Sequence, residues 1–156
     1  MAQRLKRSGM RAREFLNTVR REQREVIQLD EMINNKYSSL FPSAIRYDKD
    51  QVQTTPEDHL SKVLAEVGDM RKQLLATESK LRSHQTLATY LVGQINDSDA
   101  RRVARMYYLT LKDDGTLWTA EEVANEEGYT ERHLLRLLNQ TQIAIDAICS
   151  REQIKL

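Results

Sequence analysis

Apolar residues recur at steps of three, four or seven positions along most of this chain, the period of an α-helix with one buried face. In residues 11–40 this face holds Phe15, Val19, Val26, Leu29, Ile33 and Leu40. In residues 56–95 a seven-residue repeat holds Leu60, Val67, Leu74, Leu81, Ala88 and Ile95. A connector at residues 41–55 lacks a helical period. The pattern therefore predicts two long helices separated by a polar connector.

A helix as long as residues 56–95 exposes its apolar line unless a partner covers it. Residues 11–40 can cover it as a hairpin within the chain, or copies of the chain can self-associate as a coiled coil. Thr77 and His84 interrupt a second apolar row. We interpret His84 as a polar interruption, because no cluster of metal-ligating residue types stands at ligand spacing, and we predict no metal site.

The remaining residues, 98–156, predict three shorter helices. The first is expected over residues 99–111, with Val103, Met106, Tyr107 and Leu111 inward, and Asp97 or Ser98 as its N-cap. Thr119 and Glu122 have the spacing of a capping box. Gly128 can adopt the left-handed conformation that ends a helix, and Thr130 can cap the next one. Two helices that each begin at an N-cap, with a helix-ending glycine between them, predict a helix-turn-helix. A small residue, Ala124, stands where the two helices would approach.

The predicted fold class is therefore all-α, with a long helical hairpin or coiled coil followed by a C-terminal three-helix unit with a helix-turn-helix. We place these domains at residues 1–97, with the connector at 41–55, and at residues 98–156.

Charge is distributed unevenly along the 156 residues, although the formal net charge is only +1. Residues 1–24 contain eight Lys or Arg against two Glu, whereas residues 99–156 contain eight basic and ten acidic side chains. On the first helix Arg13, Arg20, Arg21 and Arg24 form a basic face. We expect this face to be solvated, or to contact the DNA backbone or an acidic partner. Any DNA contact in the C-terminal part depends on one local face, not on bulk charge.

Composition also limits the class of protein. The single Cys149 excludes an internal disulfide and fits a buried structural thiol in a reducing compartment. No stretch has the length and apolarity of a signal peptide or a membrane span. We expect no membrane partner, no cofactor and no enzymatic activity, because the sequence shows no Gly-rich phosphate loop, paired-carboxylate site or nucleophile–base pair.

The last helix has the face that a recognition helix needs. At ~100° per residue, its apolar side carries Leu134, Leu137, Leu138, Thr141 and Ile145. The DNA-binding candidates are Thr130, Arg132, His133, Arg136, Asn139 and Gln140. Arginine can pair bidentately with guanine, and Asn or Gln with adenine. Thr130 and the first amides of the helix can contact phosphate. Ile143 also points outward, which fits a protein contact better than a DNA contact.

Several of these segments resemble a family of small phage-encoded regulators. They are VQTTP at residues 52–56 and WTAEEVANEEGYTERHL at residues 118–134, together with the helices around them. The family has a helix-turn-helix similar to region 4 of sigma-70-type factors and includes late transcription regulators of the ArpU type. The chain departs from the pattern at Glu127, where an apolar residue usually precedes the glycine, and in the longer segment at residues 112–117.

The resemblance implies a DNA-binding phage transcription regulator in the bacterial host cytoplasm, acting on double-stranded DNA alone or with host RNA polymerase. Two alternatives stay open. One is a DNA-packaging recognition subunit similar to a small terminase, which also joins a helix-turn-helix to a helical oligomerisation element. The other is a helical protein–protein adaptor without DNA binding, with which the acidic balance of residues 99–156 is consistent.

Overall fold

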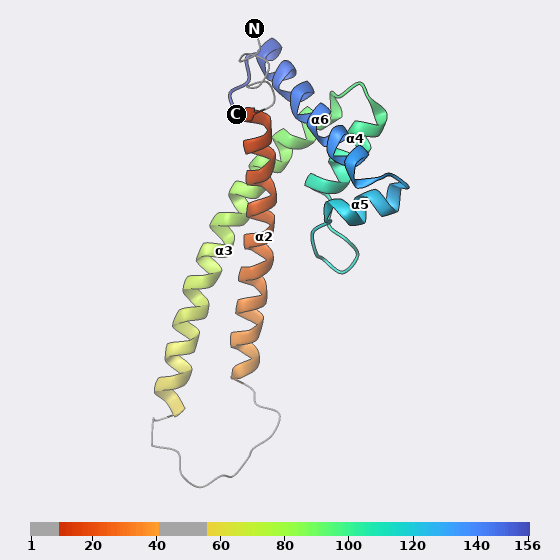
Figure 1. Ribbon diagram of the computed structural model, residues 1–156. Coiled ribbons are helices and arrows are strands. Elements are labelled where there is room, and N and C mark those ends of the chain that lie inside the picture. The colour runs from red at the N-terminus through yellow and green to blue at the C-terminus, as the bar shows by residue number, and fades with distance from the viewer. Residues whose placement is uncertain (1–9, 41–55) are drawn as a thin grey trace. The chain divides into compact units, whose positions relative to one another are not determined.

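The computed structural model describes residues 10–40 and 56–156, and this part of the chain is helical (Figure 1). The elements in order are α2 (Met10–Ser39), α3 (Pro56–Gly93), α4 (Ser98–Ala104), the π-helix η1 (Arg105–Leu109), α5 (Ala120–Glu127) and α6 (Glu131–Glu152). The only β-type pairing among the described residues is an isolated bridge between Leu111 and Leu117. The predicted all-α class is therefore confirmed. The predicted connector at residues 41–55 lies outside the described residues.

The chain divides into two compact units, and α2 and α3 contribute to both. One unit comprises Met1–Arg24 with Lys80–Leu156, and the other comprises Glu25–Ser79. This division does not coincide with the predicted boundary between residues 97 and 98. The first part of α2 and the last part of α3 belong to the same unit as the C-terminal helices. The predicted domain division itself stays a prediction.

In the unit Glu25–Ser79, α2 and α3 pack through a small apolar core. Its buried centre is Ile33 with Val63 and Val67, and the partly buried side chains around it are Tyr37, Leu40, Met70 and Leu74. An ion pair between Lys36 and Glu66 links the same two helices. Val67 and Leu74 belong to the predicted seven-residue line, so in this unit α2 covers part of that line. Leu60 of the same line is 46% exposed. Self-association through the long helix stays a prediction.

In the other unit, His84 links α3 to the first part of α2. Its Nδ1 lies 2.8 Å from Oε2 of Glu22, and its ring meets the ring of Phe15 edge-on, with centroids 5.8 Å apart. The imidazole therefore has a carboxylate and an aromatic neighbour on α2. This arrangement agrees with the interpretation of His84 as a polar interruption of the apolar row.

The π-helix η1 changes which residues of the 98–111 segment point inward. A π-turn contains one residue more than an α-turn, and the side chain buried on the turn after Val103 and Ala104 is Tyr108, not Tyr107. Tyr108 is 2% exposed, Tyr107 is partly exposed, and Leu111 is 41% exposed. The prediction that Leu111 faces inward is therefore wrong. The helix also ends at Leu109, because Thr110 takes an extended conformation.

Two polar side chains of α2 bind the end of η1. The last carbonyls of a helix have no partner within it, and here Arg20 and Gln23 supply donors. Arg20 Nη1 donates to the carbonyl of Tyr107 and, at 3.1 Å, to the carbonyl of Trp118. Gln23 Nε2 donates to the Tyr108 carbonyl at 3.0 Å. Gln23, an interruption in the apolar pattern, is thus a buried contact residue.

The prediction of an exposed basic face on α2 is wrong for Arg20. Its guanidinium lies 3.8 Å from the centre of the Tyr107 ring, in addition to its carbonyl contacts. Burial is the largest influence on this group and lowers its pKa. Arg13, Arg21 and Arg24 are exposed as expected. The basic face therefore retains these three arginines, and Arg20 instead joins α2 to the C-terminal helices.

The predicted caps of α4, α5 and α6 agree with the structure. Asp97 caps α4 by accepting from the Asp99 and Ala100 amides, and Thr119 and Glu122 form a capping box on α5. A cap that the sequence did not predict lies at the start of α2, where Asp146 of α6 accepts from the Ala12 amide at 2.9 Å. Because the first amides of a helix lack intrahelical partners, this contact joins the two ends of the described chain.

Candidate functional site

The direction of α6 is set by the short connection from α5. Gly128 ends α5 in the left-handed conformation, with φ 70°, and the Tyr129 amide donates to the Ala124 carbonyl at 2.8 Å. Thr130 then begins α6, because its Oγ1 accepts from the His133 amide at 3.2 Å. Ala124 is 2% exposed. A small, buried residue at this point allows α5 and α6 to approach closely (Figure 1).

One face of α6 is buried over its length. Each side chain predicted to face inward is at most 5% exposed: Leu134, Leu137, Leu138, Thr141 and Ile145. Thr141 Oγ1 donates to the Leu137 carbonyl at 3.0 Å, which satisfies the hydroxyl inside the core. It also lies 3.4 Å from the Ala100 carbonyl of α4. The inward face therefore packs on α4, and the opposite face points to solvent.

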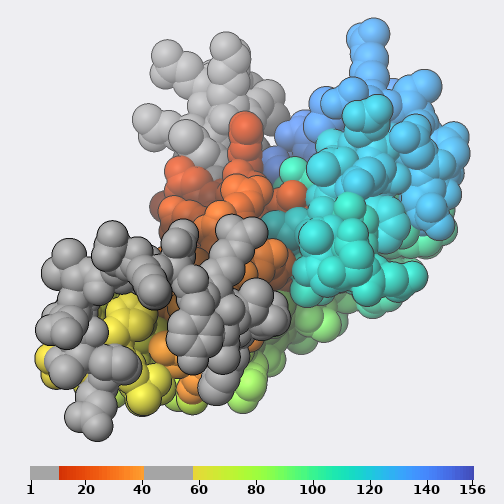
Figure 2. All heavy atoms as spheres, turned by 90° about the horizontal axis from the view of Figure 1, so that it is seen from below, coloured from red at the N-terminus to blue at the C-terminus, as the bar shows by residue number. Residues whose placement is uncertain are grey.

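The candidate DNA-binding residues lie on the solvent side of α6. Thr130, Arg132, Arg136, Asn139 and Gln140 are exposed, and His133 is half-buried. Figure 2 shows the surface of α5 and the beginning of α6 side by side, in cyan to light blue. Thr130, Arg132, His133 and Arg136 surround a hollow of about 260 Å³. The structure therefore brings together four of the six predicted residues.

His133 is engaged with its neighbours on the protein. Its Nδ1 lies 2.7 Å from Nη2 of Arg136, which can only donate, so Nδ1 is the acceptor of this contact. The His133 ring also meets the Tyr129 ring edge-on at 4.8 Å. Tyr129 in turn accepts from Arg102 Nη2 at 3.1 Å. His133 therefore orients Arg136 in this arrangement.

Glu127, the unusual residue before Gly128, pairs with Arg102 of α4. Arg102 Nε donates to Glu127 Oε2 at 2.6 Å, and this hydrogen bond is the main cause of a raised Arg102 pKa. The same guanidinium also pairs with Asp99 at 3.1 Å. The charged residue thus has a partner at the end of α5, and Ala124 beside it remains buried. Ala124 therefore stays packed with a charged residue before the glycine.

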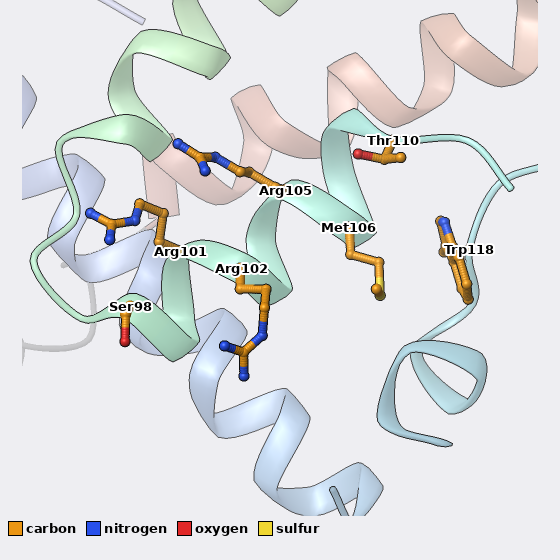
Figure 3. Close-up of a pocket in the computed structure, with 7 residues that line it drawn as sticks. All are labelled: Ser98, Arg101, Arg102, Arg105, Met106, Thr110 and Trp118. Atoms are coloured by element: carbon orange, nitrogen blue, oxygen red, sulfur yellow. The ribbon is translucent and has the colours of Figure 1, made fainter. Parts of the chain in front are cut away.

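A second hollow, of about 460 Å³, lies on α4, η1 and the residue that precedes Thr119. Figure 3 shows its lining residues: Ser98, Arg101, Arg102, Arg105, Met106, Thr110 and Trp118. Arg101 Nη1 donates to the Ile95 carbonyl at 3.1 Å. The Trp118 indole Nε1 is buried and has no hydrogen-bond partner among the described residues. Sequence reasoning missed this hollow. Its one available signal was the cluster of arginines at positions 101, 102 and 105.

Within the described part of the chain, no three His, Cys, Asp or Glu side chains are placed to hold a metal ion together. None of the described helices has both the length and the apolarity needed to cross a membrane. Cys149 is buried in α6, and burial raises the pKa of its thiol, which keeps the thiol in its poorly nucleophilic neutral form.

Comparisons of the chain with protein-family models, with curated proteins and with solved structures found no match. The resemblance to phage regulators therefore stays a prediction, and the functional argument depends on the geometry of α5 and α6.

Proposed function

We propose that the chain is a sequence-specific DNA-binding transcription regulator of the phage type, in which α5 and α6 form a helix-turn-helix. In this proposal α6 is the recognition helix and enters the major groove of double-stranded DNA. The regulator acts alone or alongside host RNA polymerase. The long helices α2 and α3 form a hairpin that holds this unit or associates with a second copy.

The observation that carries the proposal is the division of α6 into two faces. The inward face is buried on α4, whereas Arg132 and Arg136 are exposed one helical turn apart, just after the Thr130 cap. The hydrogen bond to His133 holds the Arg136 guanidinium in place. A positioned guanidinium loses less freedom when it pairs with the O6 and N7 atoms of guanine. Asn139 and Gln140 offer carboxamides for adenine on the same exposed side.

The protein adaptor is the second candidate, and two side chains on the exposed side of α6 favour it. Leu135 is 51% exposed and Ile143 is 41% exposed. Apolar side chains on a groove-binding face gain little from phosphate or base edges, apart from contact with thymine methyl groups. A protein partner would bury them. If α6 binds DNA, substitution of Leu135 or Ile143 should leave the affinity largely unchanged. If α6 binds a protein partner, the same substitutions should weaken binding of that partner.

The test is selection of a binding site from random duplexes, followed by affinity measurements at one salt concentration on the selected and a scrambled duplex. Arg132→Ala and Arg136→Ala should each weaken binding to the selected site by about 1–3 kcal/mol, roughly five- to 150-fold. Binding to the scrambled duplex should change much less, because phosphate contacts persist. Arg151→Ala, at an exposed position in the last turn of α6, is the matched control.

Equal losses on both duplexes would reduce the two arginines to backbone contacts. The protein adaptor would replace the proposal if no DNA site can be selected and if Leu135→Ser loses binding to a protein partner. A ring-shaped assembly measured by light scattering, with specific DNA binding retained, would favour the packaging subunit.

A further inference from the structure

The hollow on α4 and η1 combines an arginine rim with an apolar floor. Met106 and the Trp118 ring supply the apolar part, and Figure 3 shows that they lie together, apart from the arginines. The guanidinium groups of Arg101, Arg102 and Arg105 lie at separate places and do not converge on one point. Separate positive groups suit several carboxylates along a chain better than they suit a single phosphate.

The charge of this hollow is positive. No Asp or Glu is among its lining residues. The Arg102 charge is balanced by Glu127 and Asp99, whereas Arg101 is bound only to the neutral Ile95 carbonyl. Arg105 is exposed and has no ion pair among the described residues. Two unbalanced arginines therefore remain, one helical turn apart, which is about 6 Å along the axis.

The walls of the hollow are held in place from the side of α2. Arg20 donates to the carbonyls of Tyr107, near the end of η1, and of Trp118, at 3.1 Å. These two backbone segments therefore cannot separate without breaking hydrogen bonds from a charged donor. A site whose walls are fixed before binding avoids part of the ordering cost of association.

The hollow also lies on the opposite side of α4 from α6. Ala100, Val103 and Ala104 are the buried residues of α4, and the Ala100 carbonyl meets Thr141 of α6. Arg101 and Arg105 stand on the solvent side of the same segment. Arg102 joins the edge of the hollow to the candidate DNA-binding face through Tyr129 and His133. The buried face of α4 lies between α6 and the other two arginines, Arg101 and Arg105. We therefore consider a ligand for the hollow that is separate from a duplex on α6.

We propose that this hollow binds an acidic peptide segment of a partner protein. A large apolar side chain of the segment packs on Met106 and Trp118, and its carboxylates pair with Arg101 and Arg105. Arginine and aromatic residues are the residue types enriched at the centres of protein interfaces. The volume of about 460 Å³ is within the usual range of ligand-binding clefts. This inference does not depend on DNA binding by α6.

Trp118 is the only tryptophan of the chain, so its fluorescence reports directly on the hollow. The probe is a synthetic peptide with a central Phe-Leu pair flanked by glutamates. Control peptides replace the glutamates with lysines, or the Phe-Leu pair with Gly-Ser. We expect a saturable change of Trp118 emission with the acidic apolar peptide alone, weakening as salt rises because exposed charge pairs are screened.

Arg105→Glu should weaken peptide binding about three- to tenfold, since it removes one exposed attraction and adds a repulsion. Arg82→Glu, the same change at an exposed position of α3, should leave it unchanged. Arg105→Gln gives a second, milder variant, and circular dichroism checks that each variant is folded. Arg132→Ala should bind the peptide normally, which separates this test from that of the DNA proposal.

Three results would each overturn the proposal. The first is no saturable change up to about 1 mM peptide, the weak end of specific binding. The second is an equal effect of Arg105→Glu and Arg82→Glu. The third is displacement of the peptide by duplex DNA or by ATP in the Arg132→Ala background, which would make the hollow a nucleic-acid or nucleotide site.

Discussion

Replacing Arg20 with methionine removes a guanidinium that joins three segments of one compact unit. Its nitrogens donate to the carbonyls of Tyr107 and Trp118, and its plane covers the Tyr107 ring at 3.8 Å. Methionine keeps most of the apolar stem and cannot donate a hydrogen bond. The substitution therefore leaves two carbonyl groups without their donor and preserves much of the packing.

The size of the effect follows from these contacts. A hydrogen bond from a charged group contributes ~1.5–3 kcal/mol, and the guanidinium–ring contact adds ~0.5–1 kcal/mol. Burial lowers the pKa of Arg20, so desolvation offsets part of this gain. We expect a net loss of ~2–4 kcal/mol in the free energy of unfolding. For a chain of this size 1 kcal/mol corresponds to roughly 2–4 °C, so Tm should fall by about 4–16 °C.

The assay is urea unfolding followed by Trp118 fluorescence and by far-ultraviolet circular dichroism, with thermal melting in parallel. Arg21→Met is the matched control, because Arg21 is the exposed neighbour on the same helix, and it should change stability by less than about 0.5 kcal/mol. Arg20→Lys keeps the charge without the planar fork and should fall between the two. Equal stability of Arg20→Met and Arg21→Met would refute the structural role of Arg20.

Two further predictions concern α5. Ala124→Leu should destabilise the chain by ~1–3 kcal/mol, since Ala124 is 2% exposed beside α6 and a larger side chain overfills the contact; an unchanged Tm would show that the helices do not approach at this residue. The hydrogen bond from Lys112 is the main cause of the lowered pKa of Glu122 in the capping box. Its folded-state pKa lies below the unfolded value, so Glu122 stabilises the fold above the ordinary glutamate range and loses this effect as pH falls through the folded pKa. The loss of stability between pH 7 and acid should be smaller in Glu122→Gln than in the parent, and equal losses would contradict this assignment.

Local sequence signals determined where α4, α5 and α6 begin and where α5 ends. Asp97, Thr119 and Thr130 are N-caps in the structure, and Gly128 is the left-handed C-cap of α5. Each of these depends on atoms within a few residues along the chain, so the residue types carry the information by themselves. The period of the apolar residues likewise determined the buried face of α6, because a helix repeats with a fixed angle per residue.

Glu127 shows the limit of such signals. This acidic residue precedes the glycine, and its partner Arg102 lies 25 residues earlier in the chain. No local rule relates the two positions. The pairing becomes visible only when α4 and α5 are placed side by side.

The roles of Arg20 and Gln23, the register of η1 and the second hollow were decided by tertiary structure. Arg20 and Gln23 reach carbonyls 85 to 98 residues away. The sequence pattern placed Arg20 on the basic face and gave Gln23 no role. In η1 the buried aromatic residue is Tyr108, and Leu111 follows the end of the helix and is exposed. Short-range patterns record which face of a helix is apolar. They do not indicate which unpaired backbone carbonyls of a distant segment will lie beside a helix. Such carbonyls are the hydrogen-bond acceptors of Arg20 and Gln23 on α2.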